Sequence, residues 1–219
     1  MEYVNNSVKN IYHVQTIKTI ETYDWLLHKH YAHRIPSITF SFGLYDNKNI
    51  LCGVCTYGMP PNYQEMIAWQ PFELLELNRL VVNDDTPKNT TSYFVSSTLK
   101  LLPKPKVIIS YADFRAGHHG YIYQATNWLY TGIGGSGQKI YIMKDGKERH
   151  QRHEDMIDKN NIARIEITTG KARYYYFVGD KKTIKTMKNL LRFDILPYPK
   201  GDNQRYDTSY QPQVQTTLF

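Results

Sequence analysis

The spacing of apolar residues along the chain predicts a mixed α/β protein. Apolar residues that alternate or run without a break predict strands, and a stripe at three- and four-residue spacing predicts a helix. Strands are expected at residues 11–17, 38–46, 49–59, 73–82, 107–114, 139–146, 162–168 and 172–180. Helices are expected at residues 20–33, 92–102, 120–130 and 181–191. This order favours an α/β mixed sheet with helices on both faces.

Turn-forming residues between these blocks predict the connections. Asp46 to Asn49 favours a hairpin, and so does Thr169-Gly170-Lys171 between the last two strands. Residues 60–71 are expected to form a loop. Residues 1–200 are expected to form a single domain and residues 201–219 a polar C-terminal tail.

Composition narrows the class of partner. The chain has 27 Lys and Arg against 20 Asp and Glu, a net charge of +7, which favours an anionic partner such as nucleic acid. Many soluble basic proteins bind no nucleic acid, so this alternative stays open. Cys52 and Cys55 lie in an apolar run and are interpreted as buried packing residues. No secretion signal or bilayer-length apolar run is evident, so a cytoplasmic protein without membrane contact is expected.

Histidines cluster between residues 28 and 36. On the predicted helix His30 and His33 share one face, which suits two ligands of a metal ion. The alternative is a helix C-terminus with basic residues, which the helix dipole favours without any metal.

Three further clusters carry chemistry. Asp113 ends the most apolar strand, just before a glycine-rich turn, and this position suits a general base. The alternative is a structural role, in which Asp113 caps the next helix or pairs with Arg115. Arg79 lies in an apolar strand and needs a partner, either a ligand or a structural carboxylate. Tyr123 and Asn127 share one face of the predicted helix. This polar face either contacts a substrate or is simply exposed to solvent.

Four segments together resemble the Mom family of bacteriophage DNA-modification proteins. They are HYAHRIPSITFSFGLYD (30–46), ELNRLVV (76–82), SYADFRAGHHGYIYQATNWLYTG (110–132) and YPKG (198–201). The resemblance implies a fold like that of the GNAT acyltransferases, with a central splayed sheet whose parting strands are 73–82 and 107–114. It also implies that residues 1–200 are catalytic and convert adenine in DNA to its carbamoylmethyl (acetamido) derivative, which protects phage DNA from host restriction.

The same resemblance implies the site residues. The catalytic set carried over by matching motif is His30, Tyr31, Arg79, Asp113 and Tyr123. The double-stranded DNA substrate must extrude the target base, and the expected contacts to that base come from Tyr111, Asn127 and Trp128. An iron ion is associated with the family, and His30 and His33 keep that option open.

The donor is left open. GNAT enzymes hold coenzyme A with a glycine-rich loop, whereas residues 86–92 contain no glycine. Helix N-terminal amides at Thr90, Thr91 and Ser92 remain as an anion site, for acetyl-coenzyme A or another small acyl- or glycine-type donor. A conventional acyltransferase for a small amine or protein and a non-catalytic DNA-binding protein are the alternative functions, and a homodimer is neither required nor excluded.

Overall fold

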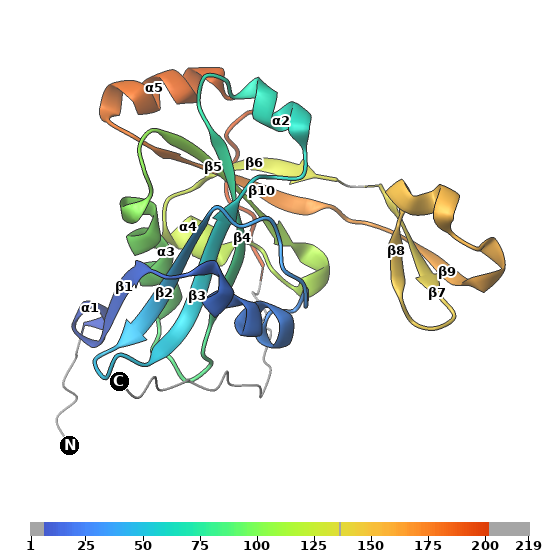
Figure 1. The fold of residues 1–219 in the computed structure, drawn as a ribbon. Coiled ribbons are helices and arrows are strands. Elements are labelled where there is room, and N and C mark those ends of the chain that lie inside the picture. Colours follow the sequence, from blue (N-terminus) through green and yellow to red (C-terminus); the bar gives the residue numbers. More distant parts are fainter. Residues whose placement is uncertain (1–6, 136, 202–219) are drawn as a thin grey trace.

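The computed structural model describes residues 7–135 and 137–201, and its centre is a seven-stranded mixed sheet (Figure 1). The strand order is β1-β2-β3-β4-β5-β10-β6. The strands are β1 (Tyr12–Thr16), β2 (Phe40–Asp46), β3 (Leu51–Gly58), β4 (Leu74–Val82), β5 (Lys106–Asp113), β6 (Leu129–Gly134) and β10 (Lys171–Val178). The predicted tail lies outside the described residues from residue 202 onward.

Helices cover both faces of this sheet, as predicted. The helices are α1 (Val8–Ile11), α2 (Tyr63–Ala68), α3 (Thr90–Leu101), α4 (Tyr121–Ala125) and α5 (Lys181–Leu190). Phe94, Val95 and Leu99 of α3 enter the larger core on one face. Met187 of α5 and Trp69, which ends α2, fill a second core on the other face. The mixed α/β class is therefore confirmed.

β4 and β5 are parallel neighbours that part after a short contact. Their backbones pair only where Leu74–Glu76 faces Val107–Ile109, although both strands continue beyond this point. Past the last pair, the Ser110 hydroxyl donates to the Leu77 carbonyl at 2.7 Å, so a side chain bridges the start of the gap. This confirms the predicted parting of these two strands.

A bulge in β4 changes which side chains share a face. Thr56 pairs with Arg79 and Tyr57 with Leu77, so Asn78 is an extra residue opposite β3. Simple alternation predicts Glu76 and Arg79 on opposite faces. Because one residue is inserted, Glu76 and Arg79 lie on the same face.

Three predicted elements differ from the structure. The first helix is a 3-10 turn, η1 (Thr19–Thr22), and a π-helical turn, η2 (Trp25–Lys29), which ends because His30 is extended. The helix predicted at 120–130 stops at Ala125, since Asn127 takes a left-handed conformation (φ 61°) that turns the chain into β6. The loop predicted at 60–71 contains α2, whose first turn is capped by the Asn62 side chain.

A second, three-stranded sheet forms an arm, residues 137–169, that projects from the edge of the central sheet between β6 and β10 (Figure 1). Its strands are β7 (Lys139–Met143), β8 (Glu148–His150) and β9 (Ile162–Ile167), in the order β8-β7-β9. The predicted hairpin at Thr169-Gly170-Lys171 is therefore wrong, because β9 and β10 belong to different sheets. The apolar patterns of β9 and β10 are those of ordinary strands, and such a pattern does not show whether two strands belong to the same sheet.

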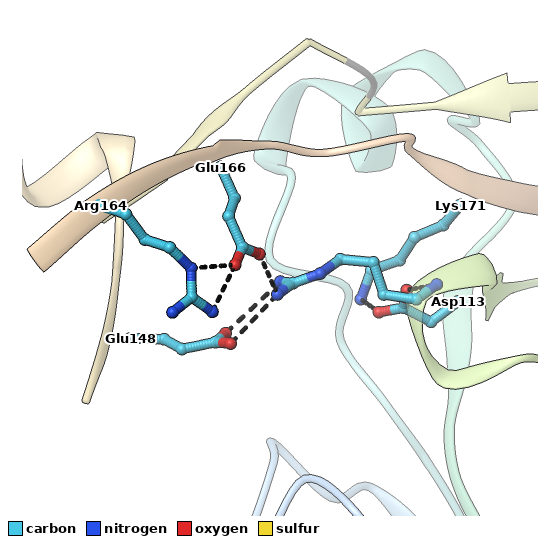
Figure 2. A network of polar contacts seen from close by, with 6 residues as sticks. Asp113, Glu148, Arg164, Glu166 and Lys171 are labelled. Carbon is cyan, nitrogen blue, oxygen red and sulfur yellow. Dashed lines mark hydrogen bonds and ion pairs between the residues drawn. The ribbon is translucent and has the colours of Figure 1, made fainter. Parts of the chain in front are cut away.

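Arg115 ties the arm to the central sheet. It lies in the 3-10 turn η3 (Phe114–Ala116) after β5, and its Nη2 contacts Glu148 at 3.1 Å and Glu166 at 2.8 Å. Figure 2 shows Arg164 on the far side of Glu166, with their ion pair at 2.8 Å. No helix among the described residues is long and apolar enough to cross a membrane.

Replacing Arg115 with Ala should loosen the arm and leave the central sheet folded. The ion pairs are partly exposed, so their loss should cost about 1 kcal/mol or less of global unfolding free energy. Amide hydrogen exchange should accelerate within residues 139–167, while β4 and β5 keep their protection. Lys147→Ala, which removes an exposed ion pair within the arm, is the matched control. Unchanged exchange in the arm of the Arg115 variant would contradict this role.

Candidate active site at the parting of two strands

Arg79 is a buried cation without an acidic partner. Its side chain is 8% exposed, its Nη1 donates to the Asn78 carbonyl at 2.6 Å, and its Nε has no hydrogen-bond partner in the described structure. Burial, and then Arg34, lower the pKa of Arg79. The structural carboxylate that the sequence left open as its partner is not found among the described residues. Arg79 thus offers an unused N–H edge to a ligand.

Glu76 is the residue that sequence reasoning missed. It is the last β4 residue paired with β5, and it forms no hydrogen bond or ion pair with any described residue. Burial raises the pKa of Glu76, against the opposing charges of Arg79, Lys171 and Arg34. The argument that singled out Arg79, a charge in an apolar strand, applies equally to Glu76 and would have found it.

Tyr123 reaches the gap from the opposite face of the sheet. Its hydroxyl lies 2.7 Å from the Ser110 hydroxyl and donates to it, because the one Ser110 proton goes to the Leu77 carbonyl. The Tyr123 ring lies 5.0 Å from that of Trp128 and 5.1 Å from that of Tyr174. Burial raises the pKa of Tyr123, and Tyr31 and Glu76 add to the effect. Tyr123 therefore stays protonated, as a fixed hydroxyl at the point where the strands part.

His30 and Tyr31 lie over the same region. Their rings stack with centroids 4.5 Å apart, and Tyr31 also contacts the ring of His118 at 5.7 Å. The Ala32 N–H donates to His30 Nδ1 at 3.0 Å, which requires the proton of the neutral ring to be on Nε2. Burial, followed by the charge of Arg79, lowers the pKa of His30 to about 3. His30 is thus a neutral hydrogen-bond donor at physiological pH.

Asp113 is already engaged on both carboxylate oxygens. Oδ1 accepts from the Arg115 main-chain N–H at 3.0 Å, and Oδ2 pairs with Lys171 at 2.9 Å (Figure 2). Asp113 therefore caps the turn after β5, which was one of the two alternatives, and it does so together with a β10 lysine. It remains close enough to Tyr31 for its charge to raise the pKa of that hydroxyl, after the larger effect of burial.

Of the three predicted base-binding residues, Tyr111 lies near Glu76 and the other two are not positioned to bind a base there. Trp128 is 0% exposed and packs in the larger core, so a base cannot stack on it without opening that core. Asn127 is exposed, but it lies past the end of α4 and does not share a helix face with Tyr123. Tyr111 packs against the second core, and burial raises its pKa, with Glu65 and Glu76 contributing.

The histidines do not fit a metal ion. Residues 30 and 33 do not share a helical face, because the helical turn ends before them and His33 has a φ of 43°. His30 Nδ1 accepts from Ala32, and His33 Nδ1 lies 2.8 Å from the Leu27 carbonyl. Within the described ranges no three His, Cys, Asp or Glu side chains gather as metal ligands. No chemical step is therefore assigned to iron.

The predicted donor site at the start of α3 offers main-chain groups rather than side chains. The Thr90 side chain is buried and its hydroxyl lacks a partner, while the Ser92 hydroxyl donates to the Asn89 carbonyl at 3.0 Å. Thr91 is half-buried beside them. These side chains are not arranged to bind a pyrophosphate, so the residues at this position do not fit coenzyme A.

Comparison with known proteins places the chain in a family. The model of the Mom protein family matches residues 11–200, so the chain belongs to the Mom family. The methylcarbamoylase Mom of Escherichia phage Mu is 26% identical over 189 residues, which cover 78% of this chain and 77% of that protein. The recognition made from the four motifs is confirmed.

Solved structures with a similar arrangement are acetyltransferases. Spermidine/spermine N-acetyltransferase SpeG from Vibrio cholerae has a TM-score of 0.45 and 8% identity, over 82% of this chain and 99% of that one. A GNAT-family acetyltransferase from Bacillus cereus has a TM-score of 0.41 and 13% identity, over 76% of this chain and 97% of that one.

Replacing His30 with Gln should reduce the loss of unfolding free energy that the protein undergoes when the pH is lowered from about 7 to about 5. The pKa of His30 is about 3 in the folded protein, whereas an unfolded chain takes up a proton near pH 6.5. Unfolding therefore binds a proton between these values, and His30 costs up to ~1.4 kcal/mol of unfolding free energy for each pH unit below about 6.5. Urea unfolding at about pH 7 and pH 5 measures the difference.

His13→Gln is the control for this measurement, because His13 is exposed on β1. If the His30 variant loses as much stability on acidification as the unsubstituted protein does, His30 is not buried as a neutral ring.

Proposed function

We propose that this protein transfers a carbamoylmethyl (acetamido) group to the 6-amino group of adenine in DNA and thereby protects phage DNA from host restriction. The observation that carries the proposal is membership of the Mom family over residues 11–200, a range that includes every residue around the parting strands. The name methylcarbamoylase of the phage Mu relative supports the group transferred.

The chemistry of the site supports a transferase. An aromatic amine is a weak nucleophile, because its lone pair is delocalised, so the enzyme must orient it and remove a proton as the new bond forms. Arg79 is a buried cation with a free N–H edge, suited to a carbonyl or leaving group that gains negative charge. His30 adds a neutral N–H donor, and Tyr123 adds a neutral hydroxyl that Ser110 holds in place.

The charge of the chain supports DNA as the substrate. The net charge is +7, and the cations Arg79, Arg34 and Lys171 all act electrostatically on Glu76 at the site. A paired adenine amine is inaccessible in a duplex, so the base has to be extruded. Tyr31, whose ring stacks on His30 and on whose hydroxyl the charges of Arg79 and Asp113 act, supplies an aromatic ring at the site in place of the buried Trp128.

DNA from bacterial cells that express the protein should contain an adenosine heavier by one carbamoylmethyl group. Arg79→Gln should lower the modified fraction by about 100-fold or more, in the range measured when one charge-stabilising donor is removed. Nucleoside mass spectrometry of plasmid DNA measures both results. Arg149→Gln, on the exposed β8 strand of the arm, should modify normally.

Unmodified nucleosides only, in cells that contain folded protein, would contradict the proposed function. A protein that acylates a small amine and leaves DNA unchanged would instead be a conventional acyltransferase.

A further inference from the structure

Glu76 stands at the junction of the parting strands. It is the last β4 residue in register with β5, opposite Ile109, and the bulge at Asn78 places it on the same face as Arg79. The Ser110 and Tyr123 hydroxyls lie next to this junction, and the charge of Glu76 affects the pKa of Tyr123. Glu76 therefore marks the closed end of the gap between the two strands.

Arg79 is buried and Glu76 half-buried, and these oppositely charged groups form no ion pair. No ion pair within 4.0 Å joins them or links either one to another described residue, and Arg79 Nε has no partner. Removing a charge from water without giving it a partner is unfavourable. Two opposite charges that act on each other but form no salt bridge are suited to a polar ligand that contacts both.

We propose that Glu76 is the base that accepts the proton from the adenine 6-amino group, an assignment that rests on the proposed function. Asp113 is the less suitable group, because one of its oxygens caps the Arg115 N–H and the other holds Lys171. Its place is that of a positioning residue, which fixes the turn after β5 and the Lys171 ammonium. The raised pKa of Glu76, caused by burial, makes its carboxylate a stronger base than an exposed one.

The transfer step balances without a redox partner. The amine nitrogen forms a bond to the carbon of the incoming group, and the bond from that carbon to the leaving group of the donor breaks. The leaving group departs with the electron pair, and one N–H proton moves to a carboxylate oxygen of Glu76. The co-reactant is a donor in which an electrophilic carbon is bonded to a leaving group. Arg79 binds the oxygen or the leaving group that becomes negative as this bond breaks.

The test compares Glu76→Gln with Glu73→Gln in cells that carry a plasmid. Both replace a glutamate of the same chain segment by an amide of equal shape, but Glu73 precedes β4 and pairs with Lys106 outside the site. Nucleoside mass spectrometry of plasmid DNA should show the modified adenosine reduced by about 100-fold or more in Glu76→Gln, the scale of a lost general base. Glu73→Gln should match the unsubstituted protein.

Two measurements on purified protein separate chemistry from folding. The thermal midpoint of Glu76→Gln should be no lower than that of the unsubstituted protein, because the amide removes a charge that has no partner. Its affinity for a fluorescein-labelled duplex containing adenine should be unchanged. Modification retained by Glu76→Gln overturns the assignment, and so does a loss that is accompanied by a lower midpoint or weaker DNA binding. If the unsubstituted protein itself leaves DNA unmodified, the proposed function fails, which is a different result from retained activity in the variant.

Discussion

The register of β4 against its two neighbours is the constraint on which the site depends. β4 pairs with β5 from Leu74 to Glu76 and with β3 from Glu76 to Val82, so the face on which its polar side chains lie has to be set where β5 departs. The Asn78 bulge does this, and side-chain bonds hold it: Asn78 Nδ2 donates to the Ser37 carbonyl at 2.8 Å, and Asn78 Oδ1 accepts from Thr56 at 2.6 Å.

The same contact positions the segment that carries His30 and Tyr31. The Ser37 carbonyl lies so close to Gly58 that a Cβ there would come within 1.9 Å of it, so only glycine allows this approach. The chain from residue 30 to residue 37 is thereby pinned against β3 and β4. One hydrogen-bonded asparagine and one glycine thus fix both the face of Arg79 and the loop that covers it.

The sequence predicts the fold class, the family and most of the residues near the parting strands. It does not predict which charged side chains form ion pairs there. Strand and helix patterns locate β1 to β5, α3 and α5, because each buries a regular apolar face. The helices predicted at 20–33 and 120–130 are too long, because an extended His30 and a left-handed Asn127 end η2 and α4 although the apolar stripe continues. Asp113 and Glu76 look alike as carboxylates in strands, and only the contacts of Lys171 and Arg115 distinguish them.

The distant YPKG segment has a structural reason to accompany the other motifs. The Tyr198 hydroxyl donates to the Trp128 carbonyl at 2.7 Å, and Gln124 of α4 donates to the Pro199 carbonyl at 3.3 Å. A Cβ on Gly201 would come within 2.7 Å of the His119 ring, so the segment packs tightly on the turn before α4. Since α4 holds Tyr123 against Ser110, the C-terminal segment supports the active site from behind, and its sequence is constrained together with that of residues 110–132.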